Sequence, residues 1–465
     1  MNYSVKINGQ KAEINQTKVS AYPLNRVWPG YQRSESQTEK AYFVNFDFDE
    51  YAEIEVETDE KIDKCEIRPT YPDINYRVDG NRISIKLDKK ISFSVEINGI
   101  QNNLCFFVNS KKCEIDKDSD EVIYFGRGEH HPGIISPKSG QTVFIDDGAV
   151  VYGGIFINEQ KDVKIIGNGI LDASFLKRGI EAKPGEKGSE AADAIRSMGL
   201  TQRDVEYSGA FVAYGCENLY IDGITILNSM FWTMILRNRC KNVTVNNVKI
   251  FGQWRYNSDG INICNSSDVK ITNCFIRAFD DCVVVRGPFL DGEYGDMGNI
   301  EVKNCVLWCD WGINMEIFCA DKETTISNIN FVNNYVIHVS STVMDIQTWF
   351  GSPNSVVKDV LYKDIMIDSN ADILRPQFQD SDETEYVYDD KEYSPRLIVL
   401  QCGKIGRNLG NQQFEEAPDI SVYHAKYENI NYVNIYAKEV YEMQIIRNRG
   451  ILDIKNVKFD NCNIG

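Results

Sequence analysis

The sequence predicts an all-β fold, a right-handed parallel β-helix preceded by an N-terminal antiparallel β-sandwich. Three observations favour this fold: a short motif recurs within residues 126–465, longer alternating strands occupy residues 1–125, and the composition suits short strands joined by turns. At 465 residues the chain is longer than one compact domain of common size. We therefore expect one elongated repeat fold with an appended domain.

The recurring motif reads Asn or Asp, apolar, any, apolar, any, and then Asn, Asp or Gly. Its copies begin at the following positions: Asp162, Asn218, Asn242, Asp268, Asn299, Asn328, Asp359, Asn429 and Asn456. The alternation predicts a short half-buried strand, and Asn, Asp or Gly at its ends tolerates the left-handed backbone of a tight turn. One such strand cannot bury its apolar face, but strands stacked at roughly 4.8 Å build a continuous core and allow ladders of Asn side chains.

Residues 1–125 lack this motif and contain longer alternating strands, at residues 51–57 and 82–87. Asn98 followed by Gly99 signals a tight turn between strands. These features predict an antiparallel β-sandwich. We expect the sandwich to cap one end of the solenoid, because an open end exposes strand edges.

The net charge, the N-terminal sequence and the cysteines indicate which partners and which compartment to expect. The formal charge of −18 excludes nucleic acid and an anionic membrane surface as expected partners, since both carry phosphates. The start lacks the features of a signal peptide, and no run of about 18 apolar residues follows. Thirteen cysteines without paired spacing fit a reducing compartment. We expect a cytoplasmic protein, and the oligomeric state stays open.

Two long gaps interrupt the motif, and they include residues 175–210 and 370–420. Long loops on a rigid solenoid are typical walls of a binding groove. The acidic run at residues 380–385 is more simply a solvated surface.

Three aspartates form the main catalytic candidate. When neighbouring rungs are aligned, Asp259 stacks on Asp281, Asp280 lies beside Asp281, and Asp310 stacks on Asp280. An Asp-Asp pair alone is often only a hydrated turn, but carboxylates stacked on adjacent rungs repel one another, which a purely structural role explains poorly. Glycoside hydrolysis uses a protonated carboxyl as the acid and an ionised carboxyl as the base. A separation of roughly 6.5–9.5 Å between these two carboxyl groups predicts inversion of the anomeric configuration.

Two motifs in this region resemble a known clan of β-helical hydrolases. Residues 257–261 read Asn-Ser-Asp-Gly-Ile and residues 279–282 read Phe-Asp-Asp-Cys. They are similar to the Asn-Thr-Asp-Gly and Asp-Asp-Cys signatures of the clan that contains glycoside hydrolase families 28, the polygalacturonases, and 49, the dextranases. The resemblance covers residue 124 to at least residue 345. It implies Asp280 as the general acid, with Asp259 and Asp281 holding and deprotonating the water.

The sequence departs from the polygalacturonase pattern at two points. Residues 312–314 read Gly-Ile-Asn where that family carries Gly-His-Gly, and no later Arg-Ile-Lys is found for a uronate carboxylate. A leading β-sandwich is also a feature of dextranases. The resemblance therefore favours a neutral glycan, such as an α-glucan, and a pectin hydrolase is the alternative.

Other residues are candidate substrate ligands, either because side-chain alternation along their strands points them outward or because they lie near the aspartates. The same alternation points Arg286, Glu316 and Asp345 outward on three successive rungs. Together they form either a stabilising ladder of opposite charges or a binding site for sugar hydroxyls. Tryptophans supply either stacking platforms or core packing. The candidate substrate-binding residues are Trp254, Asn257, Arg286, Asp310, Trp311, Glu316, Asp345 and Trp349.

No cofactor and no metal site are expected. His130 and His131 are adjacent, and adjacent residues rarely point the same way. Rival functions on the same scaffold are a polysaccharide lyase or epimerase, in which the acidic cluster would bind Ca²⁺, and a non-catalytic glycan-binding protein.

Overall fold

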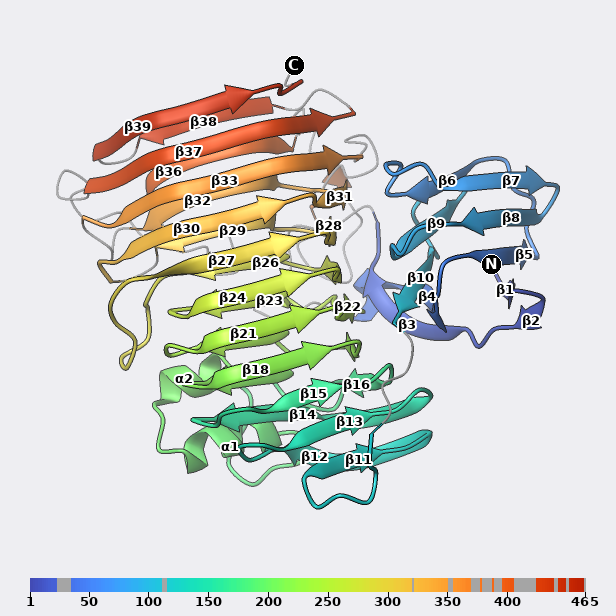
Figure 1. Cartoon of the computed structure of the whole chain (residues 1–465), viewed down its shortest axis with the longest axis horizontal. Helices are drawn as coiled ribbons and strands as arrows, with labels where there is room; N and C mark the ends of the chain where they lie inside the picture. Colours follow the sequence, from blue (N-terminus) through green and yellow to red (C-terminus); the bar gives the residue numbers. More distant parts are fainter. Residues whose placement is uncertain are drawn as a thin grey trace.

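The computed structural model describes residues 1–22, 35–110, 115–319, 322–349, 354–368, 377–378, 387–388, 395–404, 424–438, 442–448 and 451–463. These residues form two sheets of an N-terminal sandwich and one long parallel sheet that coils into a β-helix (Figure 1). The all-β fold class predicted from the sequence is confirmed. Among the described residues, none of the helices is long and apolar enough to cross a membrane.

The sandwich holds most of its strands antiparallel. One sheet has the strand order β2 (Gln10–Lys11), β1 (Tyr3–Ile7), β5 (Ala52–Thr58), β8 (Arg82–Leu87) and β7 (Asn75–Asp79). The other has the order β3 (Asn15–Ser20), β4 (Thr38–Asp47), β10 (Leu104–Asn109), β9 (Phe93–Ile97) and β6 (Cys65–Arg68), with a 3-10 turn at Glu35–Gln37. Strands β4 and β10 run parallel, so this sheet is mixed rather than purely antiparallel.

The β-helix stacks its strands in three rows along one axis. The first row holds β12 (Gly128–Ile135), β14 (Ala149–Asn158), β17 (Phe211–Tyr214), β20 (Met234–Arg237), β23 (Ile261–Cys264), β26 (Val283–Arg286), β29 (Ile313–Cys319), β32 (Thr342–Trp349), β36 (Arg396–Lys404) and β38 (Glu442–Asn448). The second row holds β11 (Val122–Phe125), β13 (Thr142–Ile145), β15 (Lys164–Ile166), β18 (Glu217–Asp222), β21 (Lys241–Asn246), β24 (Ser267–Thr272), β27 (Met297–Lys303), β30 (Thr325–Val332), β33 (Val356–Ile367), β37 (His424–Ala437) and β39 (Ile451–Asp460). The third row holds β16 (Ile170–Asp172), β19 (Thr225–Leu227), β22 (Lys249–Phe251), β25 (Phe275–Ala278), β28 (Val306–Cys309) and β31 (Tyr335–His338).

The copies of the sequence motif form strands of the second row, and the first residue of each copy has the predicted left-handed backbone conformation. Every first residue of a copy has a φ between 53° and 58°, in the left-handed region that Asn and Asp tolerate best among residues with a side chain. These side chains bond up the stack, as from Asn242 Nδ2 to Asn218 Oδ1 at 2.7 Å and from Asn328 Nδ2 to Asn299 Oδ1 at 2.8 Å. The predicted Asn ladder is therefore present.

The sandwich packs on the flank of the β-helix and does not cap its end. Figure 1 shows it beside the middle rungs, with β11 and β12 at one end of the solenoid and β38 and β39 at the other. Phe43 and Phe107 of the sandwich share a buried cluster with Phe251 and Phe275 of the third row. The third row carries large apolar side chains on its outer face, so the sandwich buries this face instead of a strand edge.

Both motif gaps contain more than loop. The first contains α1 (Glu190–Ser197) and α2 (Gln202–Glu206), which lie within the predicted loop 175–210. The predicted loop 370–420 contains the rung strand β36 and the short pair β34 (Gln377–Phe378) and β35 (Val387–Tyr388). The rest of that loop, including the acidic run 380–385, lies outside the described residues.

Candidate active site

The three predicted aspartates lie at the starts of two neighbouring strands in the first row. Asp259 precedes β23, and Asp280 and Asp281 precede β26. Ile261 pairs with Val283, and the amide of Gly260 donates to the carbonyl of Asp281 at 2.7 Å. Asp259 is therefore level with Asp281 on the next rung.

Gly312, on the next rung, lies directly against the carboxylates of Asp280 and Asp281. A Cβ atom on Gly312 would collide with Oδ1 of Asp280 and Oδ1 of Asp281, and it would lie 2.8 Å from the amide nitrogen of Asp281. The two carboxylate oxygens therefore face the same point above Gly312. The next amide, that of Ile313, donates to Asp281 Oδ1 at 2.8 Å, which stabilises the ionised form of that carboxylate.

Asp310 is not part of the cluster, which corrects the predicted register. Val283 pairs with Met315, so Gly312 and not Asp310 comes level with Asp280. The turn before β29 is two residues longer than the sequence alignment assumes. Asp310 is 0% exposed and accepts a hydrogen bond from Tyr22 Oη of the sandwich at 2.5 Å. It is enclosed by protein in the interface with the sandwich, where no substrate reaches it.

The three carboxyls differ in their solvent exposure. Asp259 is 1% exposed, whereas Asp280 and Asp281 are each partly exposed. Burial, together with the nearby charges of Asp280 and Asp281, raises the pKa of Asp259 well above its usual range. Arg286 and a 3.0 Å hydrogen bond from Asn262 Nδ2 oppose this shift in the pKa but do not cancel it. The cluster therefore favours the protonated form of Asp259.

Asn257 contacts the cluster directly. Its φ of 56° places it in the left-handed region, and its Nδ2 donates to Asp280 Oδ2 at 3.1 Å. Its Oδ1 accepts a hydrogen bond from Arg178 Nη2 at 2.8 Å. The nitrogen and the oxygen of the Asn257 amide are thus both hydrogen-bonded within the protein. A substrate that contacts Asn257, as predicted, would have to share these atoms with Asp280 or Arg178. Arg178 itself is not a sequence candidate, because it belongs to the insertion between two rungs.

The predicted polar ladder runs along the first row beside the aspartates. Glu316 pairs directly with Asp345 on the next rung, and Arg286 Nη2 lies 3.8 Å from Glu316 Oε2. Two glutamines that the sequence analysis misses complete it: Gln347 donates to Glu316, and Gln401 donates to Asp345 Oδ2 at 2.9 Å. Gln347 lies two residues after the predicted Asp345 on β32, and this even spacing is a signal that identifies it, whereas Gln401 is found only from its pairing with Gln347.

The predicted tryptophans differ in their surroundings. Trp311 is partly exposed, and its ring stacks on Phe279 with centroids 6.1 Å apart. Trp254 is 7% exposed and has the guanidinium of Arg255 over its ring at 5.5 Å. Trp311 is therefore better placed to meet a sugar face. Trp349 ends β32, and its side chain lies outside the described residues.

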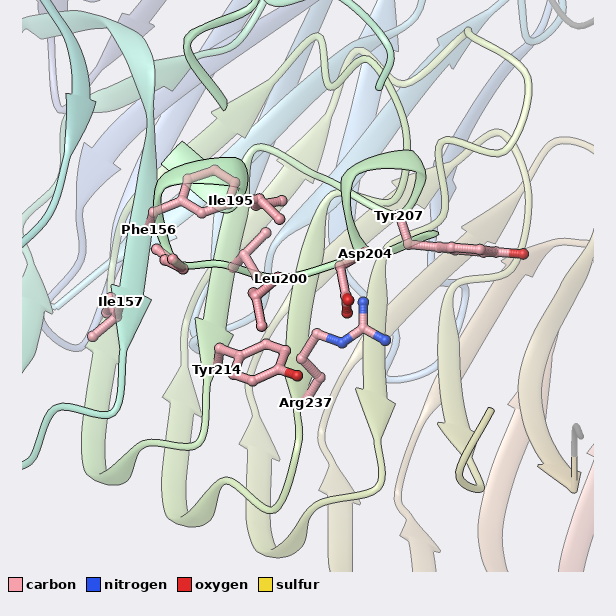
Figure 2. A pocket seen from close by; sticks show the side chains of 10 residues that line it. Phe156, Ile157, Ile195, Leu200, Asp204, Tyr207, Tyr214 and Arg237 are labelled. Carbon is pink, nitrogen blue, oxygen red and sulfur yellow. The ribbon is translucent and has the colours of Figure 1, made fainter. Parts of the chain in front are cut away.

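The insertion that carries α1 and α2 covers the first row on one side of the aspartates. Figure 2 shows the small pocket beneath it, where Ile195 and Leu200 face Phe156 and Tyr214 across an apolar space. Its polar wall includes Asp204 and Arg237, and the side chain of Arg237 also donates to Glu293 Oε1 at 2.8 Å. None of the three aspartates lines this pocket. The insertion is thus packed through apolar side chains against the first row of the β-helix.

Comparisons with known proteins agree with the motifs. The model of glycosyl hydrolases family 28 matches residues 200–379, a stretch that contains all three aspartates. A curated exopolygalacturonase of Arabidopsis thaliana, clone GBGA483, is 29% identical over 157 residues, which are 33% of this chain and 33% of that protein. A dextranase of Arthrobacter sp. (strain CB-8) is 23% identical over 235 residues, which are 47% of this chain and 33% of the dextranase. The chain thus spans about a third of the length of the curated relatives it matches.

One solved structure shares the fold over most of its length. Dex49A from Penicillium minioluteum has a TM-score of 0.59 and 14% sequence identity, covering 94% of this chain and 89% of that one. The sandwich followed by a long parallel sheet is therefore an architecture that this chain and Dex49A have in common. The resemblance to the clan of families 28 and 49 is confirmed.

Proposed function

We propose that this chain is a glycoside hydrolase that cleaves an O-glycosidic bond of an oligo- or polysaccharide at Asp259, Asp280 and Asp281. The observation that carries the proposal is the convergence of three carboxyls from two adjacent rungs, one of them with a pKa raised well above its usual range. Such a cluster holds a protonated acid and an ionised base at the same pH. The match to the family 28 model over this stretch supports hydrolysis as the reaction.

The surroundings of each carboxyl support a division of roles. Asp280 is partly exposed and acts as the general acid that protonates the leaving oxygen. Asp281 accepts the amide of Ile313, which favours its ionised form, and it deprotonates the attacking water, while the buried Asp259, whose pKa is raised, helps to hold that water. Water attack on the face opposite the leaving group inverts the anomeric configuration.

A neutral glycan is the substrate class that the charges of the first row favour. The one cation of the predicted ladder, Arg286, is compensated by Glu316, and Asp345 adds a further carboxylate. A uronate carboxylate placed on this surface would meet like charges, whereas sugar hydroxyls can donate to these oxygens. The similarity to a dextranase supports this substrate class, and an α-glucan is the first candidate.

A pectin hydrolase is the second candidate function. The curated relatives include the exopolygalacturonase from Arabidopsis thaliana. A polygalacturonase would act on a polyanion, and the acidic ladder would then weaken rather than support binding. The two candidates differ in one measurable property, the charge of the accepted substrate.

The deciding experiment measures reducing-sugar release from dextran, other α-glucans and polygalacturonate, with the wild-type chain and Asp280→Asn. We expect release from a neutral glycan and a loss of at least about 100-fold in the variant, with an unchanged melting temperature. Release from polygalacturonate alone would establish the second candidate. NMR of the first product shows the anomeric configuration, and retention would contradict the inverting scheme. Glycan binding without turnover, equal in both proteins, would indicate a binding protein, and an unsaturated product a lyase.

A further inference from the structure

Arg178 is a buried cation that the aspartate motifs do not include. It lies in the insertion between β16 and β17, before α1, and is 6% exposed. Its Nη1 donates to the carbonyl of Tyr256 at 3.0 Å and its Nη2 to Asn257 Oδ1 at 2.8 Å. Both acceptors directly precede the strand start that carries Asp259. The insertion is therefore bonded to the catalytic turn through this side chain.

We propose that Arg178 is a positioning residue for Asp280 and acts through the side-chain amide of Asn257. This inference rests on the proposed function, because it assigns the residue a part in the same reaction. Arg178 orients the amide, and the amide in turn holds the carboxyl that protonates the leaving group.

The direction of these hydrogen bonds follows from the chemistry of the groups. A guanidinium has only donors, so Arg178 requires the oxygen of the Asn257 amide to face it. The nitrogen of the amide must then face Asp280, where it donates to Oδ2 at 3.1 Å. An amide that is turned around would present its oxygen to the carboxylate and repel it. Arg178 thus decides which way the amide points.

The guanidinium is held firmly in this place. It lies over the ring of Phe231 at 4.5 Å and over that of Tyr256 at 5.7 Å. The following residue, Gly179, packs so closely on α2 that a Cβ atom would collide with the carbonyl of Val205. The insertion therefore fixes the backbone of Arg178 from one side and two aromatic rings fix its head from the other.

Arg178 also acts on the cluster by its charge. Burial lowers the pKa of Arg178, while Tyr256, Glu181 and Asp259 oppose that shift. The interaction with Asp259 is reciprocal, so the guanidinium favours the ionised form of the cluster. Loss of the charge, or loss of the Asn257 bond to ionised Asp280, raises the carboxyl pKa values. The alkaline limb of the pH profile, which reports loss of the acid proton, then moves to higher pH.

The test compares three variants on the released-sugar assay. Arg178→Met removes charge and bonds, Arg178→Lys keeps the charge without the forked geometry, and Arg196→Met is the matched control. Arg196 lies on the same insertion, and it donates to Asp193 Oδ1 at 2.7 Å and to the carbonyl of Ala182. Any effect that comes only from loosening the insertion will appear in the control as well.

For Arg178→Met we expect kcat to fall by about 10- to 100-fold with KM changed little, and the alkaline limb to move up by about one pH unit. Arg178→Lys keeps the charge but loses the forked bonds, so it lowers kcat and moves that limb by less than Arg178→Met, and Arg196→Met changes neither. Adding Asn257→Ala to Arg178→Met costs little more, because the two act in one relay. A fall in kcat equal to that of the control, or an alkaline limb that does not move, would overturn the proposal.

A second measurement separates this proposal from the proposed function. Carboxyl-carbon NMR follows the titration of Asp280 in the folded protein and needs no turnover. A higher pKa of Asp280 in both Arg178→Met and Arg178→Lys than in wild type and Arg196→Met supports the relay even if no glycan is cleaved, whereas a rise in Arg178→Met alone would show a charge effect without the relay. An unchanged titration contradicts the relay even if the enzyme is an active hydrolase.

Discussion

The hydroxyl of Tyr22 lies 2.5 Å from Asp310 Oδ1, although 288 residues separate the two in sequence. Tyr22 belongs to the sandwich, and Asp310 directly follows the third-row strand β28, two residues before Gly312. Arg277 Nε lies 3.4 Å from the same carboxylate oxygen, and Trp308 Nε1 lies 3.4 Å from the tyrosine hydroxyl. The sandwich therefore holds the turn on which Asp280 and Asp281 rest.

Tyr22→Phe tests this link. The change keeps the ring but removes a donor to a buried carboxylate, so we expect the protein to lose about 1 to 3 kcal/mol of stability. Since the turn then loses its anchor, kcat falls as well. Thermal unfolding and steady-state kinetics measure the two effects. Tyr51→Phe is the control, because Tyr51 is 47% exposed in the same sandwich. Equal melting temperatures for the two variants would show that the link carries no stability.

Glu96 makes a second link between the sandwich and the β-helix. It lies 2.7 Å from His338 Nε2 and 3.2 Å from Arg68 Nε. Burial acts to raise the pKa of Glu96, but the interactions with His338 and Arg68 outweigh it and lower the pKa from 4.5 to about 2. A lowered pKa in the folded state contributes stability above the ordinary value, and that stability is lost as the pH falls from about 4.5 towards 2.

Glu96→Gln removes this pH dependence. We expect a loss on the order of 3 kcal/mol at pH 7, and a shallower fall of stability between about pH 4.5 and 2 than in wild type. Denaturant unfolding across that range measures both. Glu57→Gln removes an exposed ion pair with Arg82 in the same sandwich and should change stability by less than about 1 kcal/mol. Parallel stability curves for wild type and Glu96→Gln would contradict the assignment.

Gly312→Ala tests the packing beneath the aspartates. The new methyl group collides with Oδ1 of both Asp280 and Asp281, so the two carboxyls must move apart. We expect turnover to fall by at least about 100-fold, because a small misplacement of reacting groups is costly. Gly292→Ala is the control, since a Cβ atom there meets only the hydroxyl of Tyr214 at 3.4 Å. Activity close to wild type in Gly312→Ala would show that the carboxyls need not meet at this point.

The rungs can be predicted from the sequence because one physical requirement repeats in every copy. A turn with positive φ selects Asn, Asp or Gly, and side-chain alternation sets which face is buried. Both are local properties, so positions such as Asn242 and Asp268 can be assigned from the chain alone. The neighbours Asp259 and Asp281 follow from the same alternation.

The remaining features depend on lengths and contacts that the motif does not encode. Asp310 is placed wrongly because the turn before β29 is two residues longer, and a shift by two keeps the alternation intact. Arg178 reaches Asn257 from an insertion without any repeat. The position of the sandwich depends on buried aromatic residues such as Phe107, which pack on the third row in a contact distant in sequence.

Asp259→Asn separates the activity of the site from its stability. Burial and two neighbouring carboxylates raise the pKa of Asp259 far above 3.8, so wild type loses stability as the pH rises above this ordinary value towards the raised one. An uncharged amide of the same shape does not titrate. We expect the variant to melt at a higher temperature than wild type, with a difference that grows from pH 5 to pH 8, while turnover falls by at least about 100-fold. Calorimetry over this pH range gives the difference, and Asp79→Asn, at an exposed position on β7, should show none. A variant that is destabilised equally at every pH would mean that Asp259 is ionised in the folded protein, which would contradict its raised pKa.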